Sequence, residues 1–243
     1  MTATPDPRMP SLFAQIAQGV RGILPVLFAG TGIVALSGIL PEGPVSGILS
    51  LVISMVATAL VAYAATLFVL SDGAVAGSEA MGRIRSRSGQ VFAMAWVFPF
   101  LVLLLVEGIV REVSGGGQSA SGRNPASFIG LIEALVFLLA LARYGTVYPA
   151  IAGGGDASLA AAGARGPGGP VFWRLLGASF FGGAILTMVL VFLAIGGSVT
   201  GAGPFALSVV MRMVSVFGTL CIVVAMAVIL CNAYRGLYAV RAS

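Results

Sequence analysis

Histidine and lysine are absent from this chain of 243 residues, and charged residues of all kinds make up only 9% of it. The absence of histidine removes the commonest metal ligand and the usual general base. The absence of lysine excludes the phosphate-binding loop of nucleotide-binding proteins. Serine, threonine and cysteine nucleophiles also lack the partners that normally activate them. The sequence therefore predicts a protein that is not an enzyme and that binds no cofactor or metal.

Cysteine is nearly absent as well. The two cysteines, Cys221 and Cys231, stand ten residues apart in the last apolar run of the chain. On one helix this spacing corresponds to roughly 15 Å of rise, which is too far for a disulfide between them. No internal disulfide is expected.

Apolar residues dominate what is present. They make up 58% of the chain, and the mean hydropathy is +1.06, whereas soluble domains carry about 25% charged residues. A membrane-spanning helix needs about 20 mostly apolar residues, so the chain has room for six spans but not for a sizeable soluble domain. The composition predicts one all-α domain of a polytopic membrane protein.

The apolar runs set the expected boundaries of this domain, which covers residues 22–238 and is followed by a tail at 239–243. Six transmembrane helices are predicted, at about 22–40, 45–70, 91–110, 127–150, 172–195 and 204–234.

Residues 1–21 precede the first predicted span. Leu12, Phe13, Ile16 and Val20 recur at helical spacing, whereas polar side chains occupy the other side of the same helix. This pattern is typical of an amphipathic helix that lies in the membrane interface.

Arginines are divided unequally between the two sides that six crossings would create. The side of the termini holds Arg8, Arg21, Arg83, Arg85, Arg87, Arg143, Arg165, Arg174, Arg235 and Arg241. Only Arg111, Arg123 and Arg212 fall on the other side. Since arginine and lysine favour cytoplasmic loops, both termini are predicted in the cytoplasm of a bacterial cell, with the chain in the cytoplasmic (inner) membrane. Membrane lipids and other membrane-protein subunits are the expected partners, and nucleic acid is not.

Three charged residues fall inside the predicted spans at comparable depth on the outer side, namely Glu107, Glu133 and Arg212, and Arg111 follows Glu107 one helical turn later. A charge at the bilayer centre costs roughly 2.5–3.5 kcal/mol on insertion scales, so these side chains should face one another inside the bundle. One interpretation is a polar pocket for an anion, a proton or a lipid headgroup. The alternative is a set of structural ion pairs, or side chains that reach to the interface.

Two further arginines are candidates for contact with lipid phosphate. Arg143 lies in the second half of the fourth predicted span beside Tyr144, and Arg174 opens the fifth beside Trp173. A guanidinium donates two parallel hydrogen bonds to phosphate oxygens. The alternative is that both residues only anchor their helices on the cytoplasmic side.

A family resemblance rests on residues near these arginines. They are Arg143 followed by Pro149-Ala150, then Ser158 and Ala161, then Trp173-Arg174-Leu175-Leu176, and finally Tyr234-Arg235. In these positions the chain resembles bacterial six-helix inner-membrane proteins related to the membrane domain of glycerophosphoryl-diester phosphodiesterases. The resemblance implies six helices in the inner membrane and no catalytic domain.

These observations favour a non-catalytic accessory or scaffold subunit of a larger membrane assembly. In that case the glycine-rich faces of the first and fifth spans, including Gly182, are expected to contact partners. The alternative is a small transporter or lipid-handling protein that uses the outer cluster of glutamates and arginines.

Overall fold

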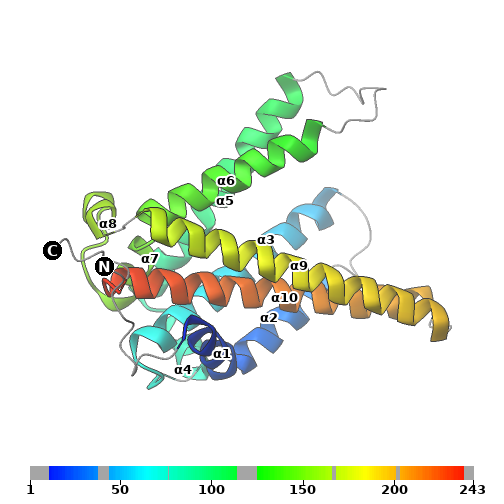
Figure 1. Cartoon of the computed structure of the whole chain (residues 1–243), viewed down its shortest axis with the longest axis horizontal. Helices are drawn as coiled ribbons and strands as arrows, with labels where there is room; N and C mark the ends of the chain where they lie inside the picture. Colours follow the sequence, from blue (N-terminus) through cyan, green and yellow to red (C-terminus); the bar gives the residue numbers. More distant parts are fainter. Residues whose placement is uncertain are drawn as a thin grey trace, which may run out of the picture.

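The computed structural model describes residues 11–37, 44–75, 77–113, 125–165, 168–200 and 203–237, and all regular structure in these ranges is α-helical (Figure 1). The elements in chain order are α1 (Leu12–Gly22), α2 (Leu24–Ser37), α3 (Pro44–Leu70), α4 (Gly77–Arg83), α5 (Arg87–Val113), α6 (Pro125–Tyr144), α7 (Val147–Gly153), α8 (Leu159–Arg165), α9 (Gly169–Thr200) and α10 (Pro204–Tyr234).

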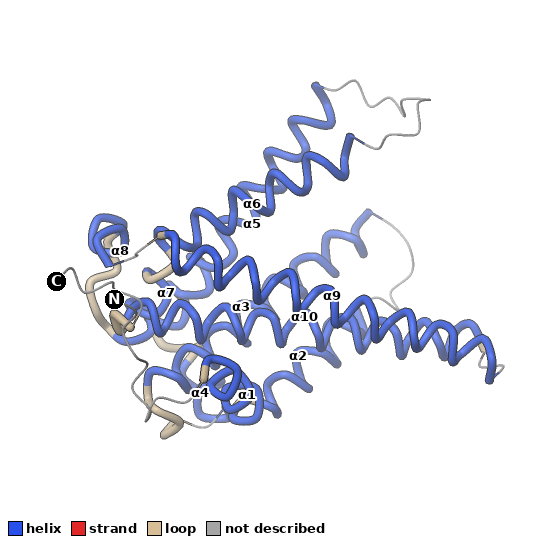
Figure 2. Tube along the Cα trace, viewed as in Figure 1, coloured by secondary structure: helices blue, strands red, loops and turns tan. Residues whose placement is uncertain are grey.

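The short helices gather at one end of the molecule, which we call the base. It consists of α1, α4, α7, α8 and the adjoining ends of the long helices (Figures 1 and 2). The long helices leave the base in different directions: α9 and α10 extend together, whereas α5 and α6 diverge from them (Figure 1). The molecule is thus closed at the base and splayed at the opposite end.

Helices α3 and α10 together form the centre of the bundle, because α3 contacts α1, α2, α4, α5 and α7, and α10 contacts α1, α2, α3, α7 and α9. Half of the residues in the most apolar 18-residue segment of α10 are buried, whereas none of the residues in the corresponding segment of α9 are. The buried core of α10 lies in its second half and includes Leu220, Val224, Val228, Ile229 and Leu230. Helix α9 is peripheral and packs on α10 and α6.

Glycines set the close packing of α9 on α10. A Cβ atom added to Gly182 would lie 2.8 Å from Cγ1 of Ile222, and one added to Gly218 would lie 2.5 Å from Cδ1 of Leu186. Each helix therefore offers a glycine where the other inserts a branched side chain, as is common between membrane helices. Gly182 packs within this chain, whereas no described atom lies within 4 Å of a Cβ added to the neighbouring Gly183.

Two pairs of consecutive helices are bent at short breaks, the first at the expected boundary between the interfacial segment 1–21 and the first span, and the second inside the span predicted at 127–150. Helices α1 and α2 meet at 69°, and the segment Ala134–Tyr144 of α6 meets α7 at 47°. Each break is followed by a proline, Pro25 or Pro149, which cannot donate a backbone hydrogen bond and collides with the carbonyl four residues earlier. The prolines account for the loss of a straight helix at both places.

The described helices confirm a membrane-embedded, all-helical protein, and they give fewer clear spans than the six expected. Three of them are long and apolar enough to cross a membrane, namely Val45–Leu70, Gly169–Val199 and Phe205–Tyr234, and the number rises to five if each bent pair forms one span. The predicted spans at 45–70, 172–195 and 204–234 match these three. The predicted span at 91–110 lies within α5, and residues 38–40 of the first predicted span lie outside the described residues.

The base also contains helices whose starts are fixed by side chains. The hydroxyl of Ser158 accepts a hydrogen bond from Ala161 N–H, and a carboxylate oxygen of Asp156 accepts one from Ser158 N–H. Together they fix the start of α8, with Ser158 as its N-cap. Helix α4 contains an i, i+4 ion pair between Glu79 and Arg83.

Candidate functional site

The predicted outer charge cluster is distributed over helices that diverge. Glu107 and Arg111 belong to α5 and Glu133 to α6, and their side chains lie outside the described residues. Arg212 belongs to α10 and is exposed. The ends of α5 and α6 remote from the base point away from the tip of α9 and α10 (Figure 1). A shared polar site of these four residues stays a prediction.

The predicted lipid-phosphate arginines both lie where long helices meet the base. Arg143 is exposed at the end of α6, and Arg174 is exposed in the first turns of α9 next to Trp173. Arg143 lines an open hollow of about 520 Å³ between α6 and α8. The other residues around it are Tyr144, Leu159, Ala160, Gly163 and Ala164. The small side chains of α8 leave space beside the guanidinium, which suits a phosphate group.

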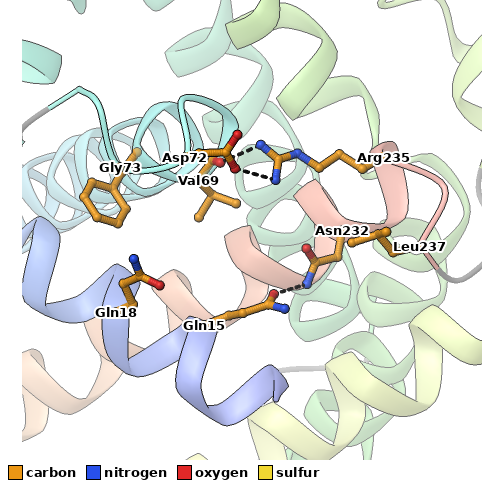
Figure 3. Close-up of a pocket in the computed structure, with 9 residues that line it drawn as sticks. Gln15, Gln18, Val69, Asp72, Gly73, Asn232, Arg235 and Leu237 are labelled. Carbon is orange, nitrogen blue, oxygen red and sulfur yellow. Dashed lines mark hydrogen bonds and ion pairs between the residues drawn. The ribbon is translucent and has the colours of Figure 1, made fainter. Parts of the chain in front are cut away.

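A second hollow, of about 310 Å³, lies beneath α1 (Figure 3), and we call it the α1 hollow. It is bounded by α1, by the end of α3 with the turn that follows, and by the end of α10. Its lining consists of Gln15, Gln18, Phe68, Val69, Asp72, Gly73, Asn232, Arg235 and Leu237. Polar groups from three separate segments of the chain thus converge on one concave surface.

One wall of the α1 hollow is formed where α1 and α10 are joined by a hydrogen bond. Asn232 Nδ2 donates to Gln15 Oε1 at 2.6 Å, and Asn232 is only 4% exposed. Close approach of α1 depends on Gly22, where an added Cβ would overlap the ring of Phe68. Small residues and one pair of carboxamides therefore hold α1 against the bundle.

The opposite wall is formed by Arg235, which joins the ends of α3 and α10. Its Nη2 donates to the carbonyls of Val69 at 2.8 Å and Leu70 at 3.1 Å, and its Nη1 lies 2.9 Å from the carboxylate of Asp72 (Figure 3). The last carbonyls of a helix lack partners within the helix, and a cation is favoured at that end. Arg235 therefore caps α3 from another helix, while Asp72, with φ of 52°, turns the chain away.

Substitution of Arg235 by methionine is expected to destabilise the protein more than substitution of Asp72 by asparagine. The first change removes the cap on two carbonyls as well as the ion pair, each hydrogen bond to a charged group contributing about 1.5–3 kcal/mol. The second change removes only an exposed ion pair, worth about 0–1 kcal/mol. Thermal unfolding of the two purified variants beside the wild type measures the difference. Equal loss in both would contradict the capping role.

Arg165 links the segment before α8 to the end of α10. Its Nη2 donates to the carbonyl of Asp156 at 2.6 Å, and its guanidinium lies 5.0 Å from the ring centre of Tyr234. Hydrogen bonds from the backbone and hydroxyl of Ser158, with the charge of Arg165, hold the pKa of Asp156 below its ordinary value. Asp156 therefore favours the folded base at neutral pH, and this contribution is lost as the pH falls through its folded pKa.

The α1 hollow went unpredicted because local patterns did not indicate it. The sequence analysis placed Phe13 on the apolar face of α1 and Gln15 on the polar one. In the structure Leu12, Ile16 and Val20 pack against the core, but Phe13 is 81% exposed and Gln15 faces Asn232. One signal was present: Asn232 interrupts an otherwise apolar span, and polar residues within spans usually have a partner.

Among the described residues no group of histidine, cysteine, aspartate or glutamate side chains is arranged to hold a metal ion. A scan against protein-family models, a search of curated proteins and a search of solved structures each found no match. The class that fold and site define is a membrane-embedded helical protein with a polar base. The resemblance to the membrane domain of glycerophosphoryl-diester phosphodiesterases stays an expectation from the sequence.

Proposed function

We propose that this chain is a non-catalytic accessory or scaffold subunit of a larger assembly in a bacterial cytoplasmic membrane, with both termini in the cytoplasm. The observation that carries the proposal is the uncovered apolar face of α9. The orientation rests on the concentration of arginines at the base, according to the preference of positive residues for the cytoplasmic side.

The uncovered face of α9 is long, aromatic and interrupted by glycine. Phe180, Phe181 and Phe192 are each more than 65% exposed, and Met188 is 63% exposed. Gly177 lies on the same side of the helix by the repeat of 3.6 residues per turn, and a Cβ added there would meet no described atom within 4 Å outside its own part of α9. Small residues between large apolar ones allow a second helix to approach closely. This surface therefore suits a helix of a partner protein, with lipid around its edges.

Replacement of Gly177 by leucine is expected to release the protein from its assembly while leaving its own fold intact. The added side chain fills space in which a partner helix would lie, and its Cβ meets no described atom outside its own part of α9. The measurement is the apparent mass of the tagged protein in a mild-detergent extract of its native membrane, for wild type and variant. A photo-crosslinking residue at Phe181 should join the wild type to a partner subunit, and one at the buried Leu220 should not.

Migration of the wild type at its own mass, with no crosslink from position 181, would overturn the proposal. If only lipid accompanies the protein, the result supports a second candidate function, that of a lipid-handling protein. The open hollow beside Arg143 also favours this function. The transporter based on Glu107, Glu133 and Arg212 stays a proposal of its own and requires these side chains to line one water-accessible cavity.

A further inference from the structure

The α1 hollow lies at the level where the bundle leaves the membrane. It is formed at the C-terminal ends of α3 and α10, both of which are long and apolar enough to span a membrane. Its volume of about 310 Å³ is at the lower end of the roughly 300–1,000 Å³ of small-molecule sites. The space suits a headgroup or a small solute rather than acyl chains.

The charged residues in the lining of the hollow disfavour the binding of an ion of either sign. The charged residues around the hollow are Asp72 and Arg235, which pair with each other at 2.9 Å. The guanidinium is engaged further by the carbonyls at the end of α3. An anion approaching Arg235 would meet the carboxylate of Asp72, which is 81% exposed, and a cation would meet the guanidinium. Because the two charges cancel, the hollow favours a neutral ligand.

The remaining polar lining both donates and accepts hydrogen bonds. Gln15, Gln18 and Asn232 each carry a carboxamide, with two donor hydrogens and an acceptor oxygen. The bond from Asn232 to Gln15 fixes two of these groups in the wall, and Gln18 lies exposed at the side (Figure 3). Hydroxyl groups match such a mixed array because each one both donates and accepts. Phe68 adds an apolar surface for the carbon atoms between the hydroxyls.

We propose that the α1 hollow binds a neutral polyhydroxyl group, either the glycerol or sugar headgroup of an uncharged lipid or a free polyol of the same chemistry. This site is separate from the exposed face of α9, so its test is independent of the test of the proposed assembly role. Helix α1 forms one wall of the site, and a bound ligand would stabilise its docking against α10.

The test uses the full chain in nanodiscs that contain equal amounts of glucosyl-diacylglycerol and phosphatidylglycerol. Native mass spectrometry measures which lipid the protein retains, and a thermal-unfolding titration with glucose in detergent without sugar headgroups tests the soluble source. We expect preferential retention of the glucosyl lipid, or a glucose-dependent rise in the unfolding temperature. Either result supports the neutral polyhydroxyl class, and the difference between them identifies the source.

The variant Gln18→Ala removes one exposed carboxamide from the lining and is expected to weaken retention about fivefold, the equivalent of one hydrogen bond. The matched control is Gln90→Ala, since Gln90 is an exposed carboxamide on α5 outside the hollow. Preferential retention of phosphatidylglycerol, or no binding of either neutral probe, would overturn the proposal. Equal retention by wild type and Gln18→Ala would also overturn it, because the ligand would then lie elsewhere.

Discussion

Replacement of Gly182 by leucine is expected to force α9 away from α10 and to lower the stability of the protein strongly. A Cβ at this position would already lie 2.8 Å from Ile222, and leucine adds three more carbon atoms. Overpacking of a tight interface costs about 1–3 kcal/mol or more. The same substitution at Gly183 meets no described atom and replaces a poor helix former with a good one.

The measurement is thermal or denaturant-induced unfolding of both variants in the same detergent. Gly182→Leu should unfold at a clearly lower temperature than the wild type, and Gly183→Leu at a similar or higher one. The adjacent pair thus separates packing of α9 against α10 from the general effect of leucine in place of a helical glycine. Equal stability of the two variants would show that α9 and α10 do not pack through Gly182.

Substitution of Asn232 by leucine is expected to have the second large effect. Asn232 is nearly fully buried and donates to Gln15 at 2.6 Å. Its removal leaves the amide of a half-buried Gln15 without this partner, at a cost of about 1–3 kcal/mol. Replacement of both residues by leucine restores an apolar contact, so the double variant should be less destabilised than the sum of the single ones.

A double-mutant cycle of Gln15→Leu, Asn232→Leu and the combination measures this coupling. Gln90→Leu serves as a control for the loss of an exposed glutamine. Proteolysis between α1 and α2 provides a second readout, since an undocked α1 should be cleaved faster. Additive effects on stability, with unchanged cleavage, would mean that the pair does not hold α1 in place.

The sequence predicted the long helices well where apolar runs end at strong signals. Predicted spans at 45–70 and 204–234 correspond to α3 and α10 almost residue for residue, because proline begins each helix and a polar segment follows each. Hydropathy reports which residues prefer lipid, and that preference is the same in a straight helix and a bent one. The break before Pro149, inside the span predicted at 127–150, was therefore invisible to it, whereas the break before Pro25 falls at the predicted start of the first span.

The site was harder to predict than the helices for a different reason. Gln15 and Asn232 are separated by 217 residues, and no local pattern links them. The helical spacing in α1 predicted an apolar side, and all its members except Phe13 pack against the core. The spacing did not show which part of the bundle each side of α1 would face. Arg143 was recognised from its place in the second half of a predicted span, whereas the hollow beside it depends on the small residues of α8.

The central position of α10 has a consequence for how the protein is made. During synthesis α10 emerges after every other described helix, yet it is the element against which α1, α2, α3, α7 and α9 pack. Until it enters the membrane, α3 can already pack with α1, α2, α4, α5 and α7, but α9 lacks its main packing surface and the hydrogen bond from Asn232 to Gln15 cannot form. A ribosome that stalls before Pro204 therefore leaves a product with α9 incompletely packed, which membrane proteases should recognise and remove.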